Sequence, residues 1–343
     1  MTINQTPFRF VALGLCLFFA LPVVPALAQA TIKQTVPSPL RDLPKDRPYE
    51  LRVLYVEDHR LPTLSVEQRR ELYGKIETLL DRWYGYTVKL REVNRRGLTE
   101  HFAAHEAWFA RQAARIRAID IDLTAADGAE RLRFAIARDF RPRALTQIER
   151  YLKGGPLESK SVAGQLAAQQ FTERLAELRA ILCLDGQPWF DPAQARLGSY
   201  GHWVVLNEEM TEADLVVTNS MILGADSEMS IYVIARGGLT TGTTDNNIHN
   251  AYQGTMGVGL LPFLSDAPVF LRERGRIPAV ELLDTIATFC MHEMGHFFLR
   301  YAEHYDHPHC VHVAPTGLNY YEWHKAIREQ GPCTLEHRKV TRF

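Results

Sequence analysis

Apolar residues recur at helical spacing over residues 278 to 304, the most apolar helical pattern in the chain after its first thirty residues. At about 100° per residue these side chains form one stripe, which should face a core. Phe289, Leu282 and Leu299 lie on the far side, so we expect both faces of this helix to be buried. The stripe consists of Leu283, Ile286, Ala287, Cys290, Met294, Phe297, Phe298 and Tyr301.

Strand and helix patterns follow one another in the first part of the chain. Residues 50 to 57 alternate like a strand, residues 64 to 84 have helical spacing, and residues 86 to 93 look like a second strand. This order predicts a β-α-β opening. Residues 98 to 182 are nearly all helical in pattern and rich in Ala, Arg, Leu and Glu, and we interpret them as a helical insertion.

Strand patterns return in the second half of the chain. They cover residues 202 to 206, 214 to 218 and 229 to 235. A polar loop rich in Gly and Thr should follow at residues 237 to 250. Pro278 then suits the first turn of the apolar helix.

Residues 1 to 30 have the pattern of a cleaved export signal. Arg9 precedes an unbroken apolar run over residues 10 to 21, and the small residues Ala28 and Ala30 follow. The run is too short to span a membrane. We therefore expect this segment to be removed, and the mature protein to be periplasmic or secreted and without a membrane span.

Composition excludes little in the rest of the chain. Residues 31 to 49 are rich in proline and indicate an extended leader. Residues 50 to 343 are long enough for one elaborated domain or two smaller ones. Lys+Arg 39 and Asp+Glu 40 nearly balance, so nothing in the charge indicates a nucleic-acid partner.

Metal-binding chemistry is indicated in the apolar helix by His292, Glu293 and His296. The two histidines lie one turn apart on the face away from the apolar stripe, so both imidazoles can reach one metal ion. Glu293 is rotated by about 100° and can sit beside the open coordination position. An H-E-x-x-H run also arises by chance, but usually in a polar surface segment or loop. We therefore predict a metal centre here.

The segment after this helix is dense in histidine. A catalytic zinc ion takes three protein ligands and keeps a fourth position for water, and the helix supplies only two. The third should come from His304, His307, His309 or His312. The alternative is a His-rich loop with weak, adventitious metal affinity.

Glu293 has the position of a general base. The metal would lower the pKa of a water molecule toward neutrality, and Glu293 would take its proton. The resulting hydroxide would attack a polarised carbonyl, most simply that of a peptide bond. We expect one Zn²⁺ as the cofactor and a peptide or protein as the substrate.

The H-E-M-G-H run with a third histidine closely downstream resembles the metzincin class of zinc endopeptidases, and archaemetzincins most. In archaemetzincins the third His is followed by a Cys and, further on, by a second Cys and a Met. Here Tyr305 stands at the first Cys, Cys310 at the second and His312 at the Met. The resemblance implies zinc binding by the histidines of the helix and by one that follows it.

The resemblance assigns the site residues. It implies that His292, His296 and His304 bind the zinc ion, with His307 as the fallback third ligand, and that Glu293 is the catalytic base.

The resemblance also implies an α+β fold, that of a metzincin-like zincin. Residues 50 to 343 would form one catalytic domain with a mixed twisted sheet and an active-site helix, and residues 302 to 343 a small lower subdomain. The insertion at 98 to 182 has no counterpart in that family. The family's edge strand binds peptide, and residues 229 to 235 are our candidate for it, with a core strand as the simpler interpretation.

The chain departs from the family pattern at defined positions. Leu299 stands where the family has a Gly at a sharp turn, and no Met follows Met294. The spacing from His296 to His304 is two residues longer. We therefore expect the helix to run on through Tyr301 and to turn later.

The cysteines allow two interpretations. In an oxidising compartment Cys310 and Cys333 would form a disulfide that ties down the C-terminal segment. The rival is that both help to bind a second, structural zinc. Cys290 faces the apolar stripe, so we exclude it as a metal ligand.

Other polar side chains are weaker candidates. Tyr305, Tyr320 and Tyr321 could each supply a phenol that stabilises an oxyanion, although packing explains at least two of the three. His101 and His105 also have i,i+4 spacing, but no carboxylate lies between them. We interpret that pair as an ordinary exposed helix face.

Two other functions compete with peptidase activity. The missing Met and Gly favour a zinc-binding or interaction protein that keeps the fold but has weak or no catalysis. A zinc amidase that acts on cell-wall peptide is a third interpretation.

Overall fold

The structure is a computed structural model of the 343-residue chain. The predicted signal peptide, the leader as far as residue 43, most of the predicted insertion and the predicted strand at 229 to 235 lie outside the residues that it describes. In the described part, no helix is long and apolar enough to cross a membrane. The described residues are 44–114, 116, 183–184, 187–188, 200–209, 212–222, 238–240, 255–299, 309–313, 315, 319–329 and 331–333.

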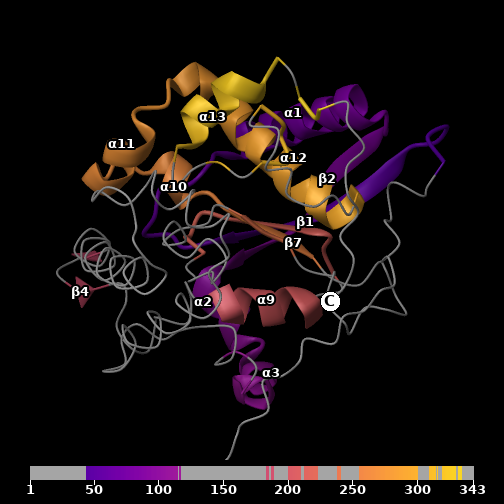
Figure 1. The fold of residues 1–343 in the computed structure, drawn as a ribbon. Coiled ribbons are helices and arrows are strands. Elements are labelled where there is room, and N and C mark those ends of the chain that lie inside the picture. The colour runs from indigo at the N-terminus through magenta and orange to yellow at the C-terminus, as the bar shows by residue number, and fades with distance from the viewer. Residues whose placement is uncertain are drawn as a thin grey trace, which may run out of the picture.

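A mixed five-stranded sheet forms the centre of the described part (Figure 1). Its order is β2-β1-β5-β7-β6, with the first four strands parallel and β6 antiparallel to β7 at one edge. A mixed sheet accompanied by helices agrees with the predicted fold at this coarse level. The strands are β1 (Tyr49–Glu57), β2 (Val88–Gly97), β5 (Leu215–Thr218), β6 (Gly238–Thr240) and β7 (Met256–Gly259); β3 (Cys183–Leu184) and β4 (Gln187–Pro188) form a separate antiparallel pair.

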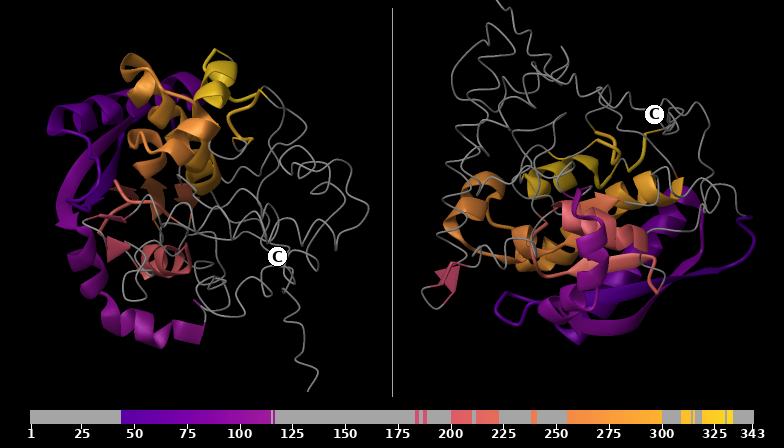
Figure 2. Two further views of the ribbon diagram at one scale, coloured as in Figure 1. Left: turned by 90° about the vertical axis from the view of Figure 1, so that its left-hand side faces the viewer. Right: turned by 90° about the horizontal axis from the view of Figure 1, so that it is seen from below.

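Helices cover both faces of the sheet (Figures 1 and 2). On one face lie α1 (Val66–Tyr84) and α12 (Leu282–Leu299), which pack on each other, and α13 (Tyr320–Ile327) beside α12. On the other face lie α2 (Leu98–Ala103) and α9 (Tyr200–Glu209). The remaining described helices are α3 (Glu106–Arg111), α10 (Leu261–Leu264), α11 (Pro268–Arg274) and the 3₁₀ turn η2 (Ala279–Glu281).

The predicted β-α-β opening is confirmed. β1 lies in the interior of the sheet, and five of its residues are buried, four of them in succession, as in a strand covered on both faces. The Ser65 side chain caps α1 by accepting a hydrogen bond from the Gln68 backbone amide, and the Gln68 side-chain oxygen accepts one from the Ser65 backbone amide. Gly85 ends the helix with a φ of +69°, a conformation that glycine adopts without steric cost.

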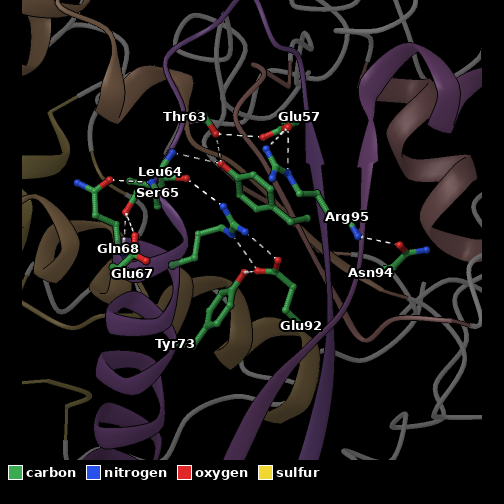
Figure 3. A network of polar contacts seen from close by, with 12 residues as sticks. Glu57, Thr63, Leu64, Ser65, Glu67, Gln68, Tyr73, Glu92, Asn94 and Arg95 are labelled. Atoms are coloured by element: carbon green, nitrogen blue, oxygen red, sulfur yellow. Dashed lines mark hydrogen bonds and ion pairs between the residues drawn. The ribbon is translucent and has the colours of Figure 1, made fainter.

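A buried ion pair joins α1 to β2. Arg69, which is 4% exposed, places two nitrogens 2.9 and 3.0 Å from the carboxylate oxygens of Glu92. Tyr73 donates its hydroxyl to the same carboxylate at 2.8 Å, and Figure 3 shows this phenol and Glu92 pointing toward each other. A bidentate pair with a third donor satisfies buried charge that would otherwise destabilise the fold.

The sequence-based prediction for residues 202 to 206 is wrong. These residues lie inside α9, where Trp203, Val205 and Leu206 are fully buried, and Trp203 packs on Phe102 of α2. An apolar run of this length is too short for its period to separate a strand from a helix. The predicted loop at 237 to 250 is also wrong in part, since residues 238 to 240 form β6, and β7 was not predicted at all.

The apolar helix is confirmed as α12 over Leu282–Leu299, entered through η2 directly after Pro278. Leu283, Ile286 and Met294 of its predicted stripe are buried, as are Ala287 and Cys290. Phe289 on the opposite side is only 4% exposed, so both faces are buried as predicted. The expected continuation through Tyr301 lies outside the described residues.

Candidate metal centre

His292 is held in one orientation by the segment that follows α12. Its imidazole is 3% exposed, and Nδ1 lies 2.7 Å from the carbonyl oxygen of Val311. Because a carbonyl only accepts hydrogen bonds, Nδ1 carries the proton, and Nε2 is the nitrogen with a lone pair. A histidine that donates one ring nitrogen to a carbonyl and presents the other to a metal is the usual arrangement of a zinc ligand. His292 therefore fits the predicted zinc ion.

Aromatic side chains fix the plane of the same imidazole. The Phe289 ring is stacked on it with centroids 6.2 Å apart, and the Trp323 ring meets it at 85° with centroids 6.1 Å apart. Trp323 is held in turn, since its indole N–H donates to the carbonyl oxygen of Val313 at 2.8 Å. Residues 311 to 313 thus support His292 directly through Val311 and indirectly through Trp323.

Glu293 is buried next to His292. It is 6% exposed, which places a carboxylate in the low-dielectric surroundings that strengthen its electrostatic effect. Burial raises the pKa of the neighbouring Cys290 thiol well above its usual value, and the charge of Glu293 raises it further. A thiol that keeps its proton is not a metal ligand. The burial of Cys290 thus agrees with its exclusion as a metal ligand.

The other predicted ligands are only partly described. His296 lies on α12 one turn after His292, but its side chain, like all of His304 and His307, is outside the described residues. Among the side chains that the structure does describe, no three of His, Cys, Asp or Glu gather around one point. The complete zinc ligand set therefore stays a prediction. His309 is exposed, and His312 is fully buried.

The turn at residues 309 to 313 passes directly against α12. A Cβ atom built on Gly295 would lie 1.8 Å from Cε1 of His312, so the imidazole occupies the space that this glycine leaves open. Nε2 of His312 lies 2.7 Å from the hydroxyl of Tyr84, the last residue of α1. The residue that stands at the Met position of the archaemetzincin pattern is thus packed on the helix that carries His292 and Glu293.

The candidate oxyanion phenols lie apart from each other. Tyr320 is 2% exposed, with its ring centroid 4.4 Å from that of Phe263 and 5.0 Å from that of Phe289. Desolvation and a hydrogen bond with Glu281 raise the pKa of Tyr321. Glu281 precedes Glu293 by about 18 Å along the helix axis. Tyr321 therefore lies toward the far end of α12, and of these two only Tyr320 packs within a turn of His292.

The two C-terminal cysteines are neighbours but are not joined. The predicted disulfide between Cys310 and Cys333 is not formed in this structure. The Cys333 amide donates to Sγ of Cys310 at 3.3 Å, and burial raises the pKa of Cys310 to about 11, which keeps it protonated. The rival second zinc stays a prediction.

The interpretation of His101 and His105 as an exposed helix face is wrong for His101. Its imidazole is completely buried beside Trp203, with ring centroids 6.2 Å apart. The cover comes from α9, which the sequence pattern presented as a strand. His105 is half-buried, and the two imidazole centroids are 5.5 Å apart.

Several supporting residues were missed from the sequence. The Val311 acceptor is a backbone carbonyl oxygen, which every residue carries, so no residue type in the sequence indicates it. Trp323 lies on the buried side of the amphipathic helix α13, and a search for aromatic residues on such helices would have found it. Tyr84 and His312 are 228 positions apart, and no spacing rule connects residues at that separation.

Comparison with known proteins gives no match. No protein-family model, no curated protein and no solved structure matches this chain. The side chains around α12 are therefore the basis for the assignment of function.

Proposed function

We propose that this chain is an exported zinc-dependent metallopeptidase of metzincin-like build, which hydrolyses peptide bonds with Glu293 as general base. The observation that carries the proposal is the bond from Nδ1 of His292 to the Val311 carbonyl. A histidine that donates Nδ1 to a carbonyl holds Nε2 in the tautomer that coordinates a metal ion, which is the usual arrangement of a zinc ligand. Export rests on the signal pattern of residues 1 to 30.

The ligand set in this proposal is His292, His296 and His304, with His307 as the fallback. A bound zinc ion would polarise the substrate carbonyl and lower the pKa of water. The side chains of this protein do the rest. The Val311 carbonyl keeps His292 in the tautomer that coordinates, and the Phe289 and Trp323 rings exclude water from one side of its imidazole.

Glu293 would move the protons. A buried carboxylate one residue from a metal ligand can accept a proton from the attacking water and deliver it to the leaving amine. Its burial at 6% exposure leaves few bulk waters to compete for that proton. General acid-base catalysis of this kind contributes about 10²- to 10⁴-fold in rate.

The test compares two glutamates that each follow a histidine of an i,i+4 pair. Glu293→Gln should keep about one zinc per chain and lose about 10²- to 10⁴-fold of the casein hydrolysis rate. Glu106→Gln is the control, because Glu106 also directly follows a histidine, His105, but lies outside that pair and is exposed. If Glu293→Gln cleaves casein as fast as the wild type, Glu293 is not the base.

A zinc protein without efficient catalysis is the second candidate, and it is favoured by His312 at the place of the family's Met. In that case the purified chain would bind zinc and turn over neither casein nor a broad peptide library. A peptidoglycan digestion run in parallel separates the peptidase from a zinc amidase that acts on cell-wall peptide.

A further inference from the structure

The hydrogen bond between Tyr84 and His312 connects α1 to α12 through the turn at residues 309 to 313. The Tyr84 hydroxyl and Nε2 of His312 are 2.7 Å apart, and the two rings are stacked with centroids 5.9 Å apart. Tyr84 is 8% exposed and His312 is 0% exposed. A hydrogen bond between two buried polar groups is costly to break, because each group left without a partner destabilises the fold by about 1–3 kcal/mol.

Gly295 fixes where His312 can sit. The imidazole fills the notch of this glycine so closely that a Cβ there would lie 1.8 Å from Cε1 and 2.3 Å from Nδ1. His312 is therefore confined between the H-E-M-G-H turn of α12 on one side and the last residue of α1 on the other.

The same end of α1 holds the other side of the turn. The Val311 amide donates to the carbonyl oxygen of Gly331 at 3.2 Å. Gly331 has a φ of +61°, and a Cβ on it would lie 2.7 Å from Nε1 of Trp83. Two consecutive residues of α1 thus hold the two segments next to Val311. Trp83 packs against Gly331, and Tyr84 bonds to His312.

Val311 directly precedes His312, so the position of one sets the position of the other to within a peptide unit. The Val311 carbonyl must lie within about 3 Å of Nδ1 of His292 to accept its proton. If the Val311 carbonyl moved about 1 Å away from the imidazole, the present 2.7 Å distance would exceed the range of a hydrogen bond.

We propose that Tyr84 and His312 are a positioning pair for the metal centre. Their hydrogen bond holds the 309–313 turn in the Gly295 notch, and the turn in turn orients His292 through the Val311 carbonyl. The inference rests on the proposed function in one respect, that Nε2 of His292 binds zinc. Outer partners of this kind typically contribute 10- to 100-fold to metal affinity.

The experiment compares two tyrosines of α1. Tyr84→Phe keeps the ring and removes the hydroxyl that bonds to His312, whereas the control Tyr73→Phe removes a buried hydroxyl whose partner is Glu92 on β2. Zinc affinity is measured on the whole purified chain by competition with a chelator, and thermal unfolding shows that each variant is folded. Tyr84→Phe should weaken zinc binding by about 10-fold or more, and Tyr73→Phe should leave it unchanged.

A second readout needs no metal. In ¹⁵N-histidine-labelled, metal-free protein the Nδ1–H proton of His292, identified by its absence in His292→Ala, should be protected from exchange. Protection should persist in Tyr73→Phe and disappear in Tyr84→Phe. Equal zinc affinity or equal protection in Tyr84→Phe and wild type would overturn the proposal that Tyr84 and His312 position His292. A wild type that binds no zinc would instead overturn the proposed function, and the proton signal would still decide on the pair.

Discussion

Two histidine pairs with the same i,i+4 spacing lie on opposite faces of the sheet, and their first members are both buried. His292 on α12 is 3% exposed and donates Nδ1 to the Val311 carbonyl. His101 on α2 is 0% exposed, yet neither of its ring nitrogens has a hydrogen-bond partner. A buried carboxylate, Glu293, follows His292, whereas Glu106, which follows His105, is exposed.

The difference shows what spacing leaves undetermined. Two imidazoles one turn apart can reach one ion wherever they occur on a helix. Around His292, and not around His101, the tertiary structure adds a carbonyl acceptor that selects the tautomer and a buried carboxylate directly after the histidine. His101 instead has an apolar cover of Phe102 and Trp203, with the pKa of its imidazole lowered to about 3 by burial, His105 and Arg96.

The largest expected effect separates the two pairs by metal affinity. His292→Ala should reduce zinc affinity by more than about 100-fold, because even the partners of ligands contribute 10- to 100-fold. His101→Ala should leave the affinity within about twofold. Metal content after dialysis against a chelator measures both. Loss of zinc in His101→Ala with retention in His292→Ala would reverse the assignment of the two sites.

Gly295→Ala tests the packing that only the α12 pair has. The new methyl group would displace the His312 imidazole and should destabilise the protein by about 3 kcal/mol or more. Gly74→Ala on α1 is the matched control, since nothing lies within 4 Å of the Cβ position and alanine there should stabilise by about 0.5–1 kcal/mol. Denaturant unfolding measures both. Equal stability changes would show that His312 moves aside freely.

The pH dependence of stability should come from His101 on α2. The pKa of His101 is about 3 in the folded chain and about 6.5 when unfolded, so the unfolded state binds more protons in between. Stability is therefore present above pH 6.5 and is lost as the pH falls, by about 2 kcal/mol between pH 6.5 and 5. His101→Phe should remove that loss, and His59→Phe, at an exposed position, should not. The free energy of unfolding of each variant is measured at both pH values. The explanation is wrong if His101→Phe loses as much stability between them as the wild type.

Trp323→Phe should have the smallest effect, confined to the α12 pair. It removes the indole bond to the Val313 carbonyl, worth about 1 kcal/mol, and leaves a ring beside His292. Zinc affinity should fall a few-fold. Trp108→Phe on α3 removes a longer indole bond to Val205 and should not change it. Equal affinities in both variants would mean that Trp323 packs without orienting His292.

The sequence-based predictions succeeded where the hydrophobic pattern had a clear period. The strand at 50 to 57, the helix at 64 to 84 and the apolar helix were predicted because their patterns run long enough to separate a period of 2 from one of 3.6. The prediction for 202 to 206 failed because that apolar run is too short to separate the two periods. The exposed-face interpretation of His101 failed with it, since its cover is α9.

The sequence by itself determined the β-α-β opening, the apolar helix and the presence of His292, Glu293 and His296 on it. These are local properties, fixed by side-chain period and by residue type. Only the tertiary structure decided that Val311, Trp323, Tyr84 and His312 surround that helix. Their contacts join residues up to 228 positions apart, and one of them is a backbone carbonyl that every residue carries. Orientation of a metal ligand is a long-range property, because the groups that set it are brought together only by packing.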